Sequence, residues 1–183
     1  MYIRVGVACN LARGWIMELH LQSHRWEARL PDWAAAAVAG FGAGGVLMLL
    51  EIGFVMATGR SDPWMTTRRV AALVMGTDVL EMRGYTAGVV AAALLVHYLL
   101  GMAFGIVLAA LIAPFKLDSS TAMALSAGAL FGVLLYAFNF LVLASTFPWF
   151  APLRGWPTLA AHVVFGMTAA FTYLKLERAE GAR

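Results

Sequence analysis

The sequence predicts an all-α integral membrane protein, a bundle of four transmembrane helices preceded by an amphipathic helix. Three observations lead to this fold class. Of the 183 residues, 62% are hydrophobic and only 13% are charged, whereas roughly a quarter of the residues of a soluble domain are charged. The mean hydropathy is +0.79. Four apolar runs, each long enough to cross a bilayer, are separated by short segments that contain prolines and charged residues.

The first predicted element is an amphipathic helix in residues 1–31 that lies in the membrane interface. Its apolar residues recur at helical spacing, and its charged residues lie off that stripe. The four-helix domain then covers residues 32–178, and residues 179–183 form a solvated tail. Asp32 is placed to cap the first span, which covers residues 33–57.

A helix that does not span the membrane is predicted for residues 63–76. Asp62 is a suitable N-terminal cap, and Pro63 suits the first helical position. The segment is too short to cross a bilayer, and Arg68 and Arg69 make it too polar. We therefore expect an interfacial helix on the membrane surface, or partly re-entrant, beside the end of the first span.

Three further spans complete the predicted domain. The second covers residues 85–113 and stops at Pro114, the third covers residues 121–147 and stops at Pro148, and the fourth covers residues 158–174. The connections between them are short, so consecutive spans are expected to run antiparallel.

Four spans place both chain termini on one side of the membrane. That side would carry eight Lys and Arg residues, and the opposite side would carry five. Because cytoplasmic segments are enriched in Lys and Arg, the difference favours cytoplasmic termini. The eight are Arg4, Arg13, Arg25, Arg29, Lys116, Lys175, Arg178 and Arg183; the five are Arg60, Arg68, Arg69, Arg83 and Arg154.

Small residues recur with the same spacing in the two halves of the chain, and each group is accompanied by a polar residue. Within each group, spacings of four and seven keep the members on one helical face. The pattern favours a tandem duplication of a two-helix hairpin. The alternative is that these GxxxG-like faces are ordinary helix-packing surfaces that match by chance. The groups are Gly40, Gly44 and Glu51; Gly128, Gly132 and Asn139; His97, Gly101 and Gly105; and His162, Gly166 and Ala170.

The polar residues on these faces predict a polar core. A carboxylate at the centre of a span costs about 2.5–3.5 kcal/mol, so Glu51 is expected to mark a site or a pair. We expect Glu51, His97, Asn139 and His162 to point into the outer half of the bundle, with Tyr136 one helical turn from Asn139. The alternative is structural: neutral side chains that hydrogen-bond to backbone carbonyls, to a tyrosine or to a neighbouring subunit.

Three kinds of chemistry fit this set of residues. His97 and His162 are candidate axial ligands of a b-type haem. Glu51, His97 and His162 together are a candidate site for zinc, iron or copper. A proton or small-solute path through Glu51 is a third hypothesis. No nucleophile is accompanied by a Ser/His/Asp arrangement, so we do not expect a catalytic residue or an enzyme, beyond at most a redox subunit.

Three short segments carry a resemblance to known proteins. They are the His-x-x-x-Gly motif that begins at His97, the segment Arg68-Arg69-Val70-Ala71-Ala72-Leu73-Val74-Met75-Gly76, and Ala161-His162-Val163-Val164-Phe165-Gly166. Over Trp33 to Leu174 the chain resembles a group of small, uncharacterised four-helix bacterial inner-membrane proteins. The resemblance implies four helices and a bacterial inner membrane, and it brings no activity with it.

Taken together, the sequence favours a non-enzymatic accessory or structural subunit that packs within a larger membrane complex, with respiratory and other redox complexes as examples. The haem-binding electron-transfer subunit and the small transporter or proton-conducting module are the alternatives. Expected partners are membrane lipids and either other membrane subunits or a second copy of the chain. Nucleic acid is not expected, because the basic residues lie between apolar segments rather than in one patch. The glycine faces were expected to support this packing; they contain Gly40, Gly44, Gly101, Gly105, Gly128, Gly132 and Gly166.

Overall fold

The computed structural model describes residues 30–59 and 62–180, and these residues form helices and connecting turns without a strand. The predicted interfacial helix in residues 1–31 lies almost entirely outside the described residues, and Leu30 to Asp32 are not helical. The α-helices are α1 (Trp33–Thr58), α2 (Pro63–Met75), α3 (Ala87–Ile112), α4 (Thr121–Ala137), α5 (Ala144–Thr146) and α6 (Trp156–Glu180). Two 3₁₀ segments, η1 (Thr77–Leu80) and η3 (Pro148–Leu153), and a π-helical turn, η2 (Phe138–Leu143), lie between them.

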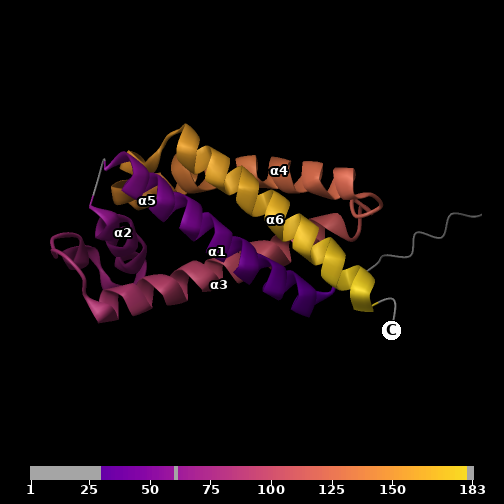
Figure 1. Cartoon of the computed structure of the whole chain (residues 1–183), viewed down its shortest axis with the longest axis horizontal. Coiled ribbons are helices and arrows are strands. Elements are labelled where there is room, and N and C mark those ends of the chain that lie inside the picture. Colours follow the sequence, from indigo (N-terminus) through magenta and orange to yellow (C-terminus); the bar gives the residue numbers. More distant parts are fainter. Residues whose placement is uncertain (1–29, 60–61, 181–183) are drawn as a thin grey trace, which may run out of the picture.

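Four helical stretches are long and apolar enough to cross a membrane, as the sequence predicts: Trp33–Thr58, Ala87–Ile112, Thr121–Thr146 and Trp156–Arg178. In Figure 1, α1 crosses α3, and α6 lies between α1 and α4. The helices α2 and α5 gather at the end of the molecule where α1 finishes and α6 begins. This end contains most of the irregular structure and, as described below, the polar residues.

The helix N-termini follow the predicted caps. The Asp32 side chain accepts a hydrogen bond from the backbone N–H of Ala35 at 2.9 Å, and Asp62 accepts one from Trp64 at 3.0 Å. These carboxylates satisfy first-turn N–H groups that have no acceptor within their own helix. The sequence therefore fixes where α1 and α2 begin.

Glycines bring two helix pairs into backbone contact. In the α1–α3 pair, a Cβ atom on Gly105 would lie 2.6 Å from both the Ala36 carbonyl oxygen and the Gly40 Cα atom. In the α4–α6 pair, a Cβ atom on Gly166 would overlap the Gly128 carbonyl oxygen. Each such contact requires a residue without a side chain. The predicted glycine faces are therefore covered by this chain's own helices, so they do not support the expectation of packing against other subunits.

The fourth span is longer than predicted because α6 continues through the charged residues after Leu174. Glu177 accepts a hydrogen bond from the Tyr173 hydroxyl at 3.2 Å, and the Lys175 ammonium group lies 5.3 Å from the centre of the Phe171 ring. Lys and Glu favour helix, and no Gly or Pro interrupts this stretch before Glu180. The sequence pattern located the end of the apolar run, whereas the helix itself extends further.

The short helix predicted for residues 63–76 is α2, which packs mainly against α3. The guanidinium of Arg68 is buried, bonds to Asp62 at 2.5 Å and donates to the Gly84 carbonyl at 3.4 Å. The indole N–H of Trp149 donates to the Arg69 carbonyl at 3.1 Å. Trp149 therefore attaches η3 to α2, although its position in the sequence is also typical of an interface anchor.

Candidate functional site

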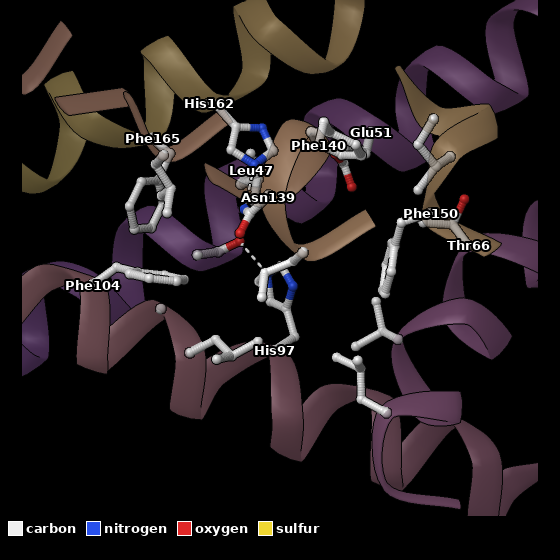
Figure 2. A pocket seen from close by; sticks show the side chains of 18 of the residues that line it. Leu47, Glu51, Thr66, His97, Phe104, Asn139, Phe140, Phe150, His162 and Phe165 are labelled. Carbon is white, nitrogen blue, oxygen red and sulfur yellow. Dashed lines mark hydrogen bonds between the residues drawn. The ribbon is translucent and has the colours of Figure 1, made fainter. Parts of the chain in front are cut away.

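A cavity of about 150 Å³ lies among α1, α3, α6 and the π-helical end of the third span. Most of its lining is apolar, with several Phe and Leu side chains. Five polar side chains also line it: Thr66 and the four predicted residues Glu51, His97, Asn139 and His162 (Figure 2). The structure therefore places these four predicted residues around one space, which we call the inner cavity.

His97 is held by the neighbouring helix. Its Nε2 atom lies 2.8 Å from the Gly44 carbonyl oxygen of α1, as the dashed line in Figure 2 shows. A carbonyl oxygen can only accept, so Nε2 carries the proton and Nδ1 keeps a lone pair. A Cβ atom on Gly44 would lie 3.6 Å from Nε2, which is an ordinary van der Waals contact. The approach of the ring to the backbone of α1 therefore leaves room for alanine at this position.

His162 has the opposite tautomer. Its Nδ1 atom lies 2.8 Å from the Thr158 carbonyl oxygen one turn earlier in α6, so Nδ1 donates. Its Nε2 atom then accepts a hydrogen bond from the Asn139 side-chain amide at 3.2 Å. The ring is 5% exposed, and the edge-on rings of Tyr136 and Phe140 pack beside it. Both nitrogens of this buried imidazole are thus satisfied.

Asn139 lies in the π-helical turn and is labelled between the two imidazoles in Figure 2. Single π-helical turns within α-helices are frequent at functional sites. Leu135, Asn139, Leu143 and Phe147 all line the inner cavity, so the turn keeps the last part of the third span facing it. The sequence analysis identified Asn139 but not the π-helical turn that carries it.

Tyr136 does not line the inner cavity. Its hydroxyl accepts a hydrogen bond from the backbone N–H of Gly155 at 3.1 Å, immediately before α6 begins. Its ring lies against Phe140 and His162. The predicted neighbour of Asn139 therefore positions the start of α6 and the His162 ring rather than contributing a polar group to the cavity.

Glu51 lies where two spaces meet. It lines the inner cavity and also a second, larger pocket of about 500 Å³. This pocket, which we call the outer vestibule, is lined by α1, α2, η3 and the first turn of α6, including Arg69, Arg154 and Thr158. The Glu51 side chain is half-buried, and within the described residues no hydrogen bond or ion pair involves its carboxyl group.

The predicted metal triad is not assembled in the part of the chain that the structure describes. No group of three or more His, Cys, Asp and Glu side chains there is arranged to hold a metal ion. Glu51, His97 and His162 share the inner cavity, but hydrogen bonds to Gly44 and Asn139 occupy the imidazole edges. These imidazoles are oriented by backbone and amide partners rather than toward a common point.

The inner cavity is too small for the predicted haem. Cofactor pockets usually enclose about 300–1,000 Å³, whereas the inner cavity encloses about 150 Å³. Ligation through Nε2 of His162 would also displace Asn139, and ligation through Nε2 of His97 would break its bond to Gly44. A macrocycle between these rings would therefore require α3 and α6 to separate.

Fold and site together define a class: the described residues are all-helical, with four helices long and apolar enough to cross a membrane, and a small, mostly apolar cavity with a few polar side chains lies near one end of them. No protein-family model, no curated protein and no solved structure matches this chain. The resemblance to small four-helix bacterial inner-membrane proteins therefore stays a prediction, and the function has to be argued from the site.

The sequence analysis missed Arg69 and Arg154 as part of the site. Arg69 was assigned to the predicted helix of residues 63–76 and Arg154 to the segment before the fourth span, and both served to judge orientation. Their only sequence signal is that both lie in segments between spans on the same predicted side of the membrane, the side toward which Glu51 lies. Which connecting segments fold over that end depends on the tertiary contacts of α2 and η3.

Proposed function

We propose that the chain is a small multi-pass protein of a bacterial inner membrane that conducts protons through Glu51. The observation that carries the proposal is that Glu51 lines both the outer vestibule and the inner cavity. A carboxyl group in this position can exchange a proton with water in the vestibule on one side. On the other side it faces the space that contains two imidazoles. Ionisable residues within spans commonly form such relays.

The hydrogen bonds around the cavity support a relay. Nδ1 of His97 keeps a lone pair because Nε2 donates to Gly44, and Nε2 of His162 is the basic nitrogen that accepts from Asn139. Because Nε2 of His162 already accepts the Asn139 amide, its lone pair is engaged. A proton delivered by Glu51 therefore has one candidate acceptor in the cavity, Nδ1 of His97, and His162 could take part only if the Asn139 amide turned away.

The proposal includes the larger complex expected from the sequence. Beyond the inner cavity, toward the chain termini, α1 and α3 are joined by alanine and glycine packing around Ala36, Gly40 and Gly105. Apart from the glutamate and the two histidines named above, no titratable residue among the described ones lines the inner cavity. We propose that a partner subunit or a second copy completes the route, with the termini in the cytoplasm and the outer vestibule on the opposite side.

We also propose that the chain arose by tandem duplication of a two-helix hairpin. Two matched contacts support it: Gly44 faces His97 across the α1–α3 pair, and Gly132 packs on the backbone of His162 across the α4–α6 pair. In both pairs the glycine is followed seven residues later by a residue of the polar cavity, Glu51 or Asn139. The halves would be related by a pseudo-twofold axis along the membrane normal.

The test is proton flux into liposomes that contain the purified protein and an internal pH-sensitive dye, driven by a potassium diffusion potential. Glu51→Gln removes the titratable group with little change in volume, and we expect it to lower the flux roughly tenfold or more. Glu81→Gln is the matched control, because Glu81 is exposed outside the spans. Equal flux through wild type and Glu51→Gln would overturn the proposal.

Two further measurements separate this function from the alternatives. A reduced-minus-oxidised visible spectrum of the purified protein is expected to show no α band, and a haem spectrum that disappears in His97→Ala and His162→Ala would favour the electron-transfer subunit. Purification in mild detergent from its native membrane is expected to bring a partner or a second copy with it. A monomer without a partner would contradict the proposed assembly.

A further inference from the structure

We propose that the outer vestibule binds a phosphate group through the guanidinium groups of Arg69 and Arg154. Arg69 lies in α2 and Arg154 directly follows η3, and both line the same pocket of about 500 Å³. Guanidinium groups recognise phosphate through paired, charge-assisted hydrogen bonds. This binding site does not depend on proton conduction, and it can be tested separately.

Arg69 is a half-buried cation, and among the described residues no hydrogen bond or ion pair involves its guanidinium group. The neighbouring Arg68 bonds to Asp62 and Gly84 through its terminal nitrogens, and its buried Nε has no partner among the described residues. Burial and the nearby charge of Arg68 lower the pKa of Arg69. A bound anion would offset the effects of burial and of the Arg68 charge, because it would supply a negative charge and hydrogen-bond acceptors to the Arg69 guanidinium.

The polypeptide around both arginines is held in place. The Arg69 carbonyl accepts the indole N–H of Trp149 at 3.1 Å, which joins α2 to η3. The Arg154 backbone N–H donates to the Ala151 carbonyl at 3.1 Å, and the next residue, Gly155, donates to the Tyr136 hydroxyl. A ligand would therefore meet a backbone that is already in place and would have the two arginine side chains to order.

The first turn of α6 adds to the positive potential of the vestibule. Trp156, Pro157 and Thr158 line it, so the N-terminal end of this long helix lies at the pocket. N–H groups in a first helical turn have no acceptor in their own helix, and the helix dipole favours an anion there. This end lines the same pocket as the two arginines, and all three features favour the same kind of ligand.

The charge balance and the location of the vestibule are compatible with two sources of phosphate. Glu51 is the one acidic residue among those that line the vestibule, against two arginines. The vestibule lies where α1 ends and α6 begins, and its rim includes the exposed side chains of Leu50 and Trp156. In a chain inserted through its four apolar helices, the ends of two spans would lie near the lipid headgroups. Both the phosphate of an anionic lipid and free inorganic phosphate would meet the same chemistry.

The experiment uses the full chain purified in a neutral detergent, with two probes. Phosphatidylglycerol, compared with phosphatidylcholine, is measured as bound lipid by native mass spectrometry. Inorganic phosphate is measured by tryptophan fluorescence, since Trp156 lines the vestibule. The variants are Arg154→Gln, Arg69→Gln and, as a charge-preserving substitute should Arg69→Gln not fold, Arg69→Lys. Arg83→Gln is the matched control, because Arg83 is exposed and does not line the vestibule.

We expect saturable binding that Arg154→Gln weakens roughly tenfold or more and that Arg83→Gln leaves unchanged. Selective retention of phosphatidylglycerol would identify a lipid headgroup as the source, and saturable binding of inorganic phosphate would identify a free anion; either supports the site. Absence of binding by both probes would overturn the proposal. Binding that folded Arg154→Gln and Arg69→Lys proteins retain in full would also overturn it. Glu51→Gln is expected to keep binding, so loss of proton flux and loss of phosphate are distinguishable.

Discussion

The α1–α3 and α4–α6 pairs share their glycine contacts and a histidine at the inner cavity, but the two histidines make different hydrogen bonds. In both, glycines allow backbone contact and a histidine lies at the edge of the inner cavity. His97 reaches across its pair to the Gly44 carbonyl, whereas His162 bonds to Thr158 in its own helix and leaves Asn139 to make the connection between helices. Equivalent positions can therefore have different structural tasks, and the difference decides which substitutions each pair tolerates.

The largest contrast is expected between Gly132→Ala and Gly44→Ala. A Cβ atom on Gly132 would lie 2.7 Å from the Val163 Cα atom, whereas one on Gly44 would lie 3.6 Å from a movable imidazole. We expect Gly132→Ala to lower the free energy of unfolding by about 1–3 kcal/mol or more and Gly44→Ala to keep the fold. Thermal unfolding in detergent, with Gly42→Ala as an open-space control, measures this. Equal losses at both positions would show that the pairs are alike.

The two histidines are expected to differ next. His162 is buried and satisfied through both nitrogens, so His162→Ala leaves the Asn139 amide without its partner and opens a cavity, while the Thr158 carbonyl keeps its helical hydrogen bond. We expect a loss of about 2–4 kcal/mol. His97→Ala frees only the Gly44 carbonyl from a half-buried side chain, and we expect about 1 kcal/mol. Unfolding midpoints of the two variants test the order, and a larger effect at His97 would reverse it.

The smallest expected effect concerns α2, which accompanies the first pair and has no helical counterpart beside the second. Hydrogen bonds from Arg68 and then from the Trp64 backbone lower the pKa of Asp62 from its ordinary value of 3.8. A lowered carboxyl pKa contributes stability that is present above the ordinary value and is lost as the pH falls through the lowered one. We therefore expect hydrogen exchange in α2 to accelerate below about pH 3.8, while α6 stays protected. Asp62→Asn should remove this pH dependence.

The four long helices and their caps could be predicted because each depends on local sequence. Apolar runs of sufficient length, Asp32 before α1 and the Asp62-Pro63 step before α2 are all short-range signals. The meeting of Glu51, Asn139 and the two histidines around one cavity was also expected, since spacings of four and seven keep groups on one helical face.

Other features depend on information that a sequence pattern does not contain. A glycine face does not reveal which helix covers it, so the faces at Gly40 and Gly128 suggested a partner, whereas α3 and α6 occupy them. The extension of α6 to Glu180 and the joining of Arg69 to Arg154 in the outer vestibule depend on packing between distant segments. Helical periodicity is also too coarse to show a single widened turn.

That widened turn sets the phase of the third span. In a regular α-helix, residues four apart advance by 400°, so a series of such steps drifts around the axis by about 40° each time. Leu135, Asn139, Leu143 and Phe147 are spaced in this way and yet share one cavity, because the π-helical turn takes up the accumulated rotation. Removing one residue between Asn139 and Leu143 would rotate the remainder by about 100° and direct Phe147 elsewhere. The number of residues in this one turn therefore decides which later side chains of the third span line the cavity.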